Sequence, residues 1–519
     1  MKKRGWIWAA LALSCYALLL ALLLLAERGS PQSGIRSLGD ALWYSLVTLA
    51  TVGYGDLYPV TPLGRAVGLL FVLLSVGALA AVLGAAFSLL RSRALPWLQL
   101  RRLSRSEAFI FSEYNAYTAA LAQDLRTSFP AARMAFCRAA QDQPAAPGLS
   151  RRAVFFSQSA EEVARGAAGP GQKTVFLMGA NAAENYAAAR SLSSLPLTVY
   201  CRGAETGDLP QVRFFDLPAC AARAYWQAHP LQANERDVLL AGDGALARAL
   251  LDHAVLVNCR LPFRRTVYHL YGDWTAYRLD HPGLSQVFSL DAEEEGRDAL
   301  LFHDTPWNAR PELLESGARI IFCGDDPAAN GDAALRLTRL FPFTGRAYAA
   351  AEAAPAPCVP FGAPREICTR RVVLEGELDR QARMLHALYT GQAGQQQAWE
   401  TLSPFMKASN RASADHLLTK LRLLLPEENI LSCTPENCAR AAEKWLALPD
   451  REDCRRCEHH RWMRFYALYN WRYGPQKDAE RRLHPCLVPY AQLSLEDQEK
   501  DDNAWQLMVL LSDKGGDAV

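Results

Sequence analysis

Hydrophobic and polar positions divide this chain into three differently patterned parts. The first ninety residues hold two apolar runs, Trp6–Ala26 and Ala66–Leu90, of 21 and 25 residues without a charged side chain. Short apolar runs then alternate with longer mixed segments from about residue 108 to 350. From Leu374 onward, apolar positions recur at helical spacing. The pattern predicts two long apolar helices, then alternating strands and helices, then a mainly α-helical C-terminal part.

Both apolar runs are long enough to cross a bilayer as helices, because ~20 residues at ~1.5 Å each span its hydrocarbon layer. The first run exceeds the ~7–15 apolar residues of a signal peptide. Basic residues precede the first run (Lys2, Lys3, Arg4) and follow the second (Arg91, Arg93). Positive flanks remain on the cytoplasmic side. We therefore expect a multi-pass protein of the cell's inner (plasma) membrane, in contact with the lipid bilayer, with both termini in the cytoplasm.

The middle part predicts two α/β units. Expected strands are Ala108–Ser112, Ala132–Cys137, Ala153–Ser157, Thr174–Met178, Leu197–Cys201, Asp237–Ala241, Thr266–Leu270 and Arg319–Cys323. Expected helices are Thr118–Thr127, Ala182–Ser194 and a segment that ends near Val257. Short strands that alternate with helices favour parallel, doubly wound sheets. The expected fold is thus a two-span helical membrane domain, tandem Rossmann-like α/β domains and a mainly helical C-terminal domain.

Composition narrows the function classes. The formal net charge of +2 argues against a nucleic-acid partner, which usually requires a strong basic excess. Twelve of the thirteen cysteines follow residue 91, where a cytoplasmic location keeps them reduced. No Ser/His/Asp order, paired carboxylate motif or P-loop occurs at a useful spacing. We therefore expect no enzyme and no catalytic cofactor.

The segment between the two apolar runs reads Thr51-Val52-Gly53-Tyr54-Gly55 after an expected short helix, residues 38–50. Non-helical backbone at membrane depth is tolerated only where it is buried in protein or lines a wet cavity. Gly53 and Gly55 permit positive φ, so that successive carbonyls can turn towards one axis. A ring of such carbonyls replaces the hydration shell of K⁺. One chain supplies one strand of that ring, so four chains are needed and we expect a homotetramer.

The string T-V-G-Y-G-D-L-Y-P-V-T resembles the selectivity filter of two-transmembrane potassium channels, over roughly residues 5 to 95. The resemblance implies that Thr51, Val52, Gly53, Tyr54 and Gly55 line the ion sites, with K⁺ as the permeant ion. It also implies a hydrogen bond between Trp43 and Asp56 behind the filter. Some relatives carry a glutamate where this chain has Val47, a departure that concerns inactivation and not selectivity.

Two further glycines, Gly77 and Gly84, lie in the second apolar run. They are candidate bending points for gating. Membrane helices also use glycine for close packing, so both interpretations stay open.

The second α/β unit contains Gly242-Asp-Gly244-Ala-Leu-Ala247, a G-x-G-x-x-A string between a strand and a helix. This is the context for phosphate binding at a helix N-terminus. Asp273 is a candidate ribose ligand, although it lies further along the chain than the usual ~20 residues. The alternative is a structural turn that lets strand and helix pack closely. The paired units resemble the regulatory RCK-type (TrkA-N-like) domains of ligand-gated potassium channels.

The C-terminal part resembles the RyR domain. The resemblance rests on four segments, Glu458–Met463, Asn470–Pro475, Leu483–Pro489 and Asp497–Asp502. Aromatic faces suit stacking of a base, and arginine suits bidentate recognition of phosphate. The candidate pocket residues are Arg461, Trp462, Trp471, Arg472, Tyr473 and His484. The alternative is a small core with satisfied polar groups.

Four cysteines, Cys433, Cys438, Cys454 and Cys457, have ribbon-like zinc spacing. The RyR resemblance does not require a metal there, and we expect none.

The expected division is a pore domain (1–95), two regulatory domains (96–232 and 233–355), a linker and helical connector (356–395), and a RyR-type domain (396–519). The Ala/Pro-rich stretch 351–364 is the clearest expected linker. The predicted function is a tetrameric potassium channel gated by a small cytoplasmic, nucleotide-like ligand. The alternative is a membrane-anchored nucleotide receptor, or a dinucleotide-binding protein, that does not conduct ions.

Overall fold

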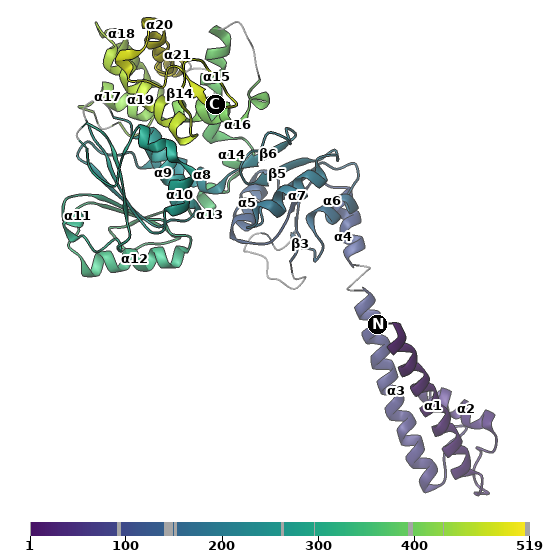
Figure 1. Ribbon diagram of the computed structural model, residues 1–519. Coiled ribbons are helices and arrows are strands. Elements are labelled where there is room, and N and C mark those ends of the chain that lie inside the picture. Colours follow the sequence, from purple (N-terminus) through teal and green to yellow (C-terminus); the bar gives the residue numbers. More distant parts are fainter. Residues whose placement is uncertain are drawn as a thin grey trace. The chain divides into compact units, whose positions relative to one another are not determined.

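The computed structural model describes residues 2–90, 95–139, 149, 153–260, 264–294, 296–392, 398–428 and 430–513, with no side-chain description for residues 2–13 and a few others in the helices. Contacts divide the chain into two units, Met1–Arg102 and Leu103–Val519. Figure 1 shows the helices and strands of each unit.

The described part of the first unit contains α1 (Lys2–Glu27), α2 (Leu38–Leu49), α3 (Pro62–Leu89) and most of α4 (Leu95–Ser104). The side chain of Ser37 caps α2, and Thr61 caps α3 with Pro62 at its first position. A small core that includes Leu23, Ile35 and Phe71 joins the helices. Among the described residues, no helix meets the length and apolarity required to cross a membrane.

A buried carboxylate connects α1 to α3. Glu27 is 1% exposed and accepts hydrogen bonds from the backbone N–H of Val60 (3.1 Å) and Thr61 (2.9 Å) and from the Thr61 hydroxyl (2.7 Å). A Cβ at Gly64 would lie 1.9 Å from Oε1 of Glu27. Glycine at this position therefore makes room for the carboxylate that fixes the connection.

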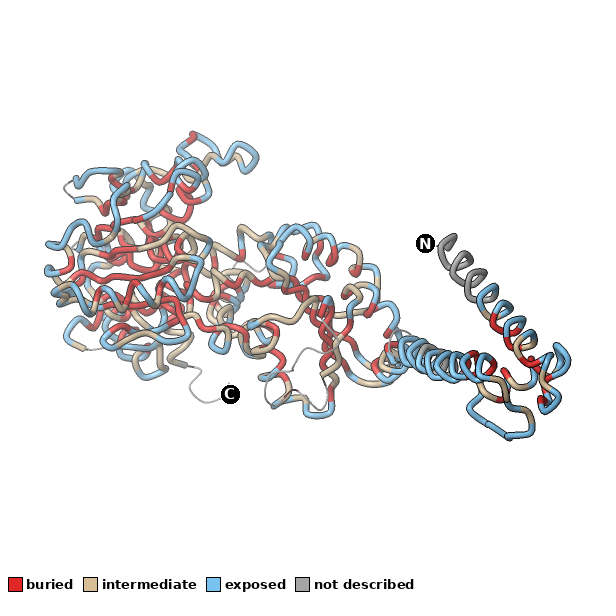
Figure 2. The backbone as a smooth tube through the Cα atoms, turned by 90° about the horizontal axis from the view of Figure 1, so that it is seen from below, coloured by how far each residue is buried: buried red, intermediate tan, exposed pale blue. Residues whose placement is uncertain are grey.

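The second unit begins with a six-stranded parallel sheet in the order β3-β2-β1-β4-β5-β6. Its strands are β1 (Ala108–Phe111), β2 (Arg133–Phe136), β3 (Ala153–Phe155), β4 (Lys173–Leu177), β5 (Thr198–Arg202) and β6 (Val212–Phe215). The helices between them are α5 (Ala116–Ser128), α6 (Ala160–Gly166) and α7 (Ala182–Leu192). The central strands are buried (Figure 2), as near-continuous apolar runs predict for a parallel sheet. The prediction of a doubly wound sheet is confirmed here.

The second sheet is also parallel and has seven strands in the order β13-β12-β11-β7-β8-β10-β9. Its strands are β7 (Asp237–Ala241), β8 (Val267–Tyr271), β9 (Ser289–Leu290), β10 (Ala299–His303), β11 (Arg319–Phe322), β12 (Arg346–Ala350) and β13 (Val359–Phe361). The helices around them are α8 (Leu217–Ala228), α9 (Ala245–Val257), α10 (Thr275–Asp280), α11 (Pro311–Glu315) and α12 (Pro327–Leu340).

The stretch 351–364 was expected to be a linker and contains the edge strand β13. Pro360 lies within this strand, at a position where proline is tolerated because an edge strand has one unpaired side. The second sheet therefore extends past the expected boundary at residue 355.

The C-terminal part is mainly helical, as predicted. Its helices are α13 (Pro364–Ile367), α14 (Arg370–Val373), α15 (Arg380–Gln392), α16 (Pro404–Asp415), α17 (Leu417–Leu424), α18 (Pro435–Leu446), α19 (Glu452–Leu468), α20 (Leu495–Lys500) and α21 (Gln506–Asp513). A two-stranded ribbon joins β14 (Arg472–Tyr473) to β15 (Leu483–His484). Helices α16 and α19 pack against α9, so the second sheet and the C-terminal part share one core (Figure 1).

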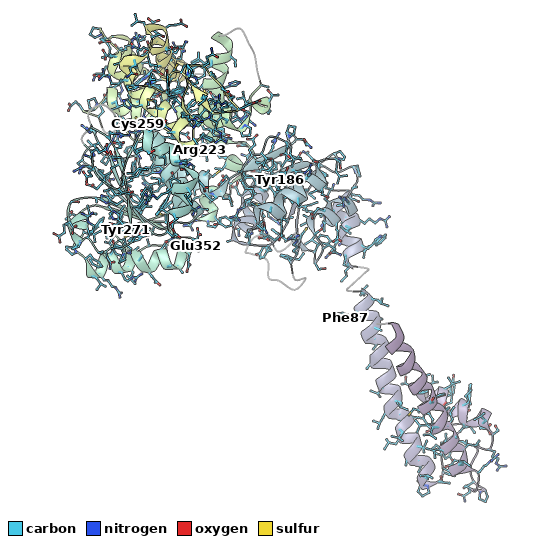
Figure 3. All side chains as sticks on the ribbon, viewed as in Figure 1. Phe87, Tyr186, Arg223, Cys259, Tyr271 and Glu352 are labelled. Carbon is cyan, nitrogen blue, oxygen red and sulfur yellow. The ribbon has the colours of Figure 1, made fainter. Side chains whose placement is uncertain are left out.

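A buried ion network crosses this junction. Arg223 on α8 donates from Nε to Asp415 (2.7 Å) and from Nη1 to Asp379 (2.7 Å), and Asp415 belongs to α16. Arg411 also binds Asp379, at 2.6 Å. Figure 3 labels Arg223 between the teal and green parts of the chain. Because these groups are desolvated, each depends on its partner for compensation.

We predict that Arg223→Ala destabilises the protein by about 3–5 kcal/mol, because it leaves the two aspartates without this buried cation. Thermal or denaturant unfolding of the purified chain measures the change. The matched control is Arg138→Ala, whose pair with Glu184 is about half exposed at 2.8 Å and should contribute under ~1 kcal/mol. Equal effects of the two substitutions would contradict the assignment of Arg223 as a stabilising contact of the junction.

Candidate functional site

The backbone of the segment Thr51–Gly55 alternates in handedness. Thr51, Gly53 and Gly55 have φ of 58°, 59° and 74°, and Val52 and Tyr54 lie between them without positive φ. Positive φ is uncommon for a residue other than glycine, so the positive φ of Thr51 could not be predicted from its residue type. Alternation of this kind lets successive carbonyl oxygens face the same side, as a carbonyl-lined ion path requires.

The side chains around this segment pack against α2. Trp43 donates from Nε1 to Oδ2 of Asp56 at 2.8 Å, which is the contact that the resemblance implies. The Trp43 and Tyr54 rings are stacked with centroids 6.3 Å apart. The N–H of Val52 donates to the Val47 carbonyl at 3.0 Å. Val52 and Tyr54 are 51% and 69% exposed in the single chain.

Helix α3 continues without a break through Gly77 and Gly84. Within the described residues, no atom lies within 4 Å of a Cβ built at either position. Close approach inside one chain therefore does not explain these glycines, and bending there stays a prediction.

The G-x-G-x-x-A turn joins β7 to α9, as expected, but protein atoms surround it closely. A Cβ at Gly242 would lie 2.5 Å from the N of Gly324, and one at Gly244 would lie 1.9 Å from Oδ1 of Asp325. The Asp243 carboxylate accepts a hydrogen bond from the N–H of Asp273 at 2.6 Å. These contacts account for Gly244 by packing, whereas Gly242 also has a φ of 145° that favours glycine. The same contacts also place carboxylates where a phosphate would approach the helix.

A cavity of about 650 Å³ lies beside this turn, at the carboxyl ends of β7, β8 and β10, and Asp273 lines it. Tyr271 and Trp274 line it too and are 4% and 2% exposed (Figure 3 labels Tyr271). Neither the Tyr271 hydroxyl nor Nε1 of Trp274 has a hydrogen-bond partner among the described residues. Ala247 is fully buried and packs into the core instead.

A second cavity, of about 440 Å³, lies in the C-terminal part between α16, α19 and α20. Of the six residues expected to form a pocket, Arg461, Trp462 and His484 line it. Trp471 is 6% exposed and stacks on Phe405 in the core, with ring centroids 5.5 Å apart.

The two remaining pocket candidates, Arg472 and Tyr473, are exposed on β14 and do not line this cavity. Glu458, Asp497 and Asp501 also line the cavity. In the sequence they belong to segments that carry the RyR resemblance, but they are not among the expected pocket residues.

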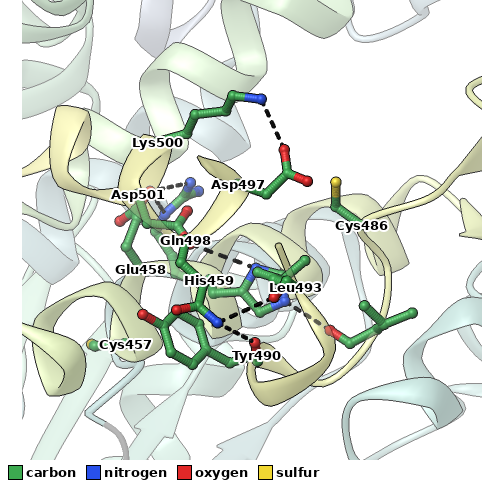
Figure 4. A network of polar contacts seen from close by, with 12 residues as sticks. Cys457, Glu458, His459, Cys486, Tyr490, Leu493, Asp497, Gln498, Lys500 and Asp501 are labelled. Carbon is green, nitrogen blue, oxygen red and sulfur yellow. Dashed lines mark hydrogen bonds and ion pairs between the residues drawn. The ribbon is translucent and has the colours of Figure 1, made fainter. Parts of the chain in front are cut away.

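The charges of this cavity are coupled (Figure 4). Glu458 accepts from Arg461 at 2.6 and 2.9 Å and lies 2.9 Å from Nζ of Lys420. Burial opposes ionisation of Glu458, but Arg461 and Lys420 outweigh it and lower its pKa to about 2. Burial and the Glu458 charge raise the pKa of Asp501 to about 8. Burial lowers the pKa of His484 to about 4.

Arg461 gives this cavity an unusual donor. Its side chain is 2% exposed, and Nη1 has no hydrogen-bond partner within the described residues. A buried donor without a partner costs about 1–3 kcal/mol, so a ligand that accepts from it regains that free energy on binding.

The four zinc-like cysteines occupy a helical core. Cys438, Cys454 and Cys457 are buried among apolar side chains, and Cys433 packs beside them. Burial raises the pKa of Cys438 and Cys454 to about 11. In the described part of the chain, no three His, Cys, Asp or Glu side chains are placed to hold a metal ion.

Comparison with known proteins agrees with these features. Residues 7–92 match the model of the ion channel family, and residues 451–512 match that of the RyR domain. The chain carries an ion-channel domain and a RyR domain. The resemblance inferred from the filter segment and from the aromatic C-terminal motifs is thereby confirmed.

The relatives of the channel domain are potassium channels. A voltage-gated potassium channel of Aeropyrum pernix is 43% identical over 60 residues, 12% of this chain and 20% of the relative. The human potassium voltage-gated channel subfamily A member 10 is 45% identical over 51 residues, 10% of each chain. The chain thus spans a fifth or less of the length of these relatives, none of which is described as an enzyme.

Solved structures of the GsuK channel are similar over a longer stretch. The ADP-bound form has 15% identity and a TM-score of 0.36, and covers 71% of this chain and 99% of its own. The NAD-bound form has 13% identity and a TM-score of 0.33, and covers 72% and 84%.

The raised pKa of Asp501 predicts a pH dependence of the RyR domain. The folded state keeps this proton up to about pH 8, whereas the unfolded chain loses it near 3.8, the usual pKa of an aspartate. The folded state thus binds more protons between these values, and stability falls as pH rises through that window. Asp501→Asn removes this pH-dependent loss of stability. The free energy of unfolding of the variant, minus that of the parent, should therefore rise by roughly 2–4 kcal/mol between pH 5 and 8.

Thermal unfolding of both chains at pH 5, 6, 7 and 8 measures this difference. Asp497→Asn is the matched control, because Lys500 and Ser494 lower the pKa of Asp497 and its removal should give no such rise. A difference between Asp501→Asn and parent that is independent of pH would contradict the assignment.

Proposed function

We propose that four copies of this chain form a potassium-selective channel in the inner membrane. Four copies of Thr51–Gly55 close a ring of carbonyls around the ion path, and α1 and α3 cross the bilayer around it. The alternating φ of Thr51, Gly53 and Gly55 is the observation that carries the proposal, because it serves no packing purpose within one chain. Exposed Val52 and Tyr54 are available to pack as a cuff around the ring.

A small cytoplasmic ligand gates the pore in this proposal. Its principal receptor is the cavity between α16, α19 and α20, called the RyR-domain cavity below. The cavity combines an aromatic wall, the half-buried Trp462 and the buried Tyr466, with the Nη1 donor of Arg461, which has no partner among the described residues. Such a mixture of aromatic surface and a few convergent polar groups suits a nucleotide-like ligand. A ligand shifts a gate only through different affinities for its two states, so the cavity must change shape between them.

The cavity beside β7, β8 and β10 is the second candidate receptor. The buried Tyr271 hydroxyl and the Trp274 indole N–H favour it, since both lack partners in the described residues. The carboxylates of Asp243 and Asp325 oppose a pyrophosphate at Gly242 and Gly244. This cavity therefore suits a base or ribose better than a dinucleotide held by its phosphates.

The rival proposal is an anchored nucleotide receptor that conducts no ions. It places the ligand in the same RyR-domain cavity, but it does not explain the alternating φ of Thr51, Gly53 and Gly55. Potassium flux from liposomes that contain the purified chain separates the two.

We predict that Gly55→Ala abolishes this flux while the tetramer stays assembled. A Cβ at φ 74° costs ~1–2 kcal/mol in each of four subunits, although no neighbouring atom in the chain lies within 4 Å of it. Flux assays and native mass spectrometry measure the two properties. Gly29→Ala is the control, because its φ is not positive and its Cβ site is equally open. Selective flux in Gly55→Ala would remove the filter assignment.

For the receptor, Trp462→Ala should weaken binding of an activating nucleotide about 5- to 150-fold, since base–aromatic stacking contributes ~1–3 kcal/mol. Calorimetry with AMP, ADP, ATP and cyclic AMP, and flux in their presence, measure this. Tyr473→Ala is the aromatic control, because Tyr473 is 57% exposed outside the cavity. Equal losses in both variants, or no heat with any nucleotide, would move the receptor away from this cavity.

A further inference from the structure

A small basic cavity lies where the C-terminal helix α17 meets the end of α9. Its volume is about 260 Å³. Arg260 and Arg264 line it from the segments that follow α9 and precede β8, and Arg422 lines it from α17. Figure 3 labels Cys259, which directly precedes Arg260. This cavity is separate from the RyR-domain cavity and from the cavity beside β7, β8 and β10.

Positive charge is in excess at this cavity. Three guanidinium groups, from Arg260, Arg264 and Arg422, face a single carboxylate, that of Glu428. Glu428 is already paired with Arg440, which lies 2.5 Å away and is not part of the lining. Among the described lining residues, no unpaired carboxylate therefore balances the charge of the three guanidinium groups.

The neighbouring buried carboxylates are also engaged elsewhere. Glu235 accepts from Arg319 at 3.1 and 2.7 Å, and Arg346 lies 3.7 Å from it. Asp298 accepts from Arg464 at 2.7 Å. Each of these two acids thus has a buried guanidinium of its own.

The electrostatics of Arg422 reflect this imbalance. Burial lowers its pKa first, and repulsion from Arg319, Arg346 and Arg264 lowers it further against the attraction of Glu235. Burial likewise lowers the pKa of Arg260. Buried cations are usually paired or hydrogen-bonded, so an unpaired excess indicates a missing counter-ion.

The donors of this cavity are held in place. Arg260 is 8% exposed and donates to the carbonyls of Gln232 (2.9 Å) and Glu235 (2.8 Å). Its Nε is buried without a hydrogen-bond partner in the part of the chain described. Arg422 is fixed by a bond to Oε1 of Gln232 at 3.0 Å. A buried donor without a partner and two anchored guanidinium groups make a pre-organised site.

We propose that this cavity binds a phosphate group, either as inorganic phosphate or as the terminal phosphoryl group of a larger ligand. Guanidinium groups match the oxygens of phosphate with charge-assisted hydrogen bonds. The volume is below the ~300–1,000 Å³ of pockets that enclose whole organic ligands, so one anionic group fits. Bound phosphate contacts both α17 and the segment after α9, and it therefore stabilises their packed arrangement.

The test titrates the purified full-length chain in detergent with sodium phosphate at constant ionic strength, by calorimetry and by thermal unfolding, with sodium chloride as the blank. We expect saturable heat and a rise in Tm with phosphate. Arg422→Gln and Arg264→Gln should each raise Kd about ten- to hundred-fold, the effect of one charge-assisted hydrogen bond. Arg264 is exposed, so its variant tests the site without a risk to folding.

Arg339→Gln is the control, because it removes the same charge from an exposed position on α12 and should leave Kd unchanged. AMP and adenosine distinguish the sources. Heat with AMP but with neither phosphate nor adenosine, lost in Arg264→Gln, assigns the site to the phosphoryl group of an organic ligand. No saturable heat with phosphate or AMP, or equal Kd in parent and both site variants, overturns the proposal.

Discussion

Buried guanidinium groups, each held by a carboxylate from a different element, are the interaction on which the second unit depends. Arg223 joins α8 to Asp415 of α16, and Arg464 of α19 joins Asp298 before β10 at 2.7 Å. Both pairs connect an α/β element to a C-terminal helix. Because separation would leave a buried charge alone, these pairs resist any motion that parts the two regions. A ligand that shifts the C-terminal helices would therefore also shift the second sheet, because the two regions pack as one body.

The glycines of this chain illustrate two physical roles behind similar strings. Gly53 and Gly55 have positive φ and open space at their Cβ sites, so torsion alone requires glycine there. At Gly244 the reverse holds, because φ is ordinary and a Cβ would strike Asp325. The first pattern fits a backbone that presents carbonyls, and the second fits close packing of strand and helix. In the sequence, the filter string resembles a known motif, whereas the G-x-G-x-x-A string leaves phosphate binding and a structural turn both open.

Much of the fold follows from local pattern. The parallel strands β1, β4 and β7 were predictable because they are continuous apolar runs bounded by polar turns. The strand β13 was not, since three residues that include a proline carry no strand signal and pair only because β12 lies beside them. In the RyR-domain cavity, Arg461, Trp462 and His484 were predictable from side-chain type. Glu458 and Asp501 were not, because their roles arise from burial, which the helical packing creates.

The distribution of charge also depends on the fold and not on composition. A net charge of +2 excludes a chain-wide basic face, yet it says nothing about how charges are distributed after folding. Arg260 and Arg422 lie 162 positions apart in the sequence and line one cavity, while the acids near them are taken by other arginines. Local excess of one sign is therefore a property of the tertiary structure. A nearly neutral chain can in this way hold an anion site that no composition measure detects.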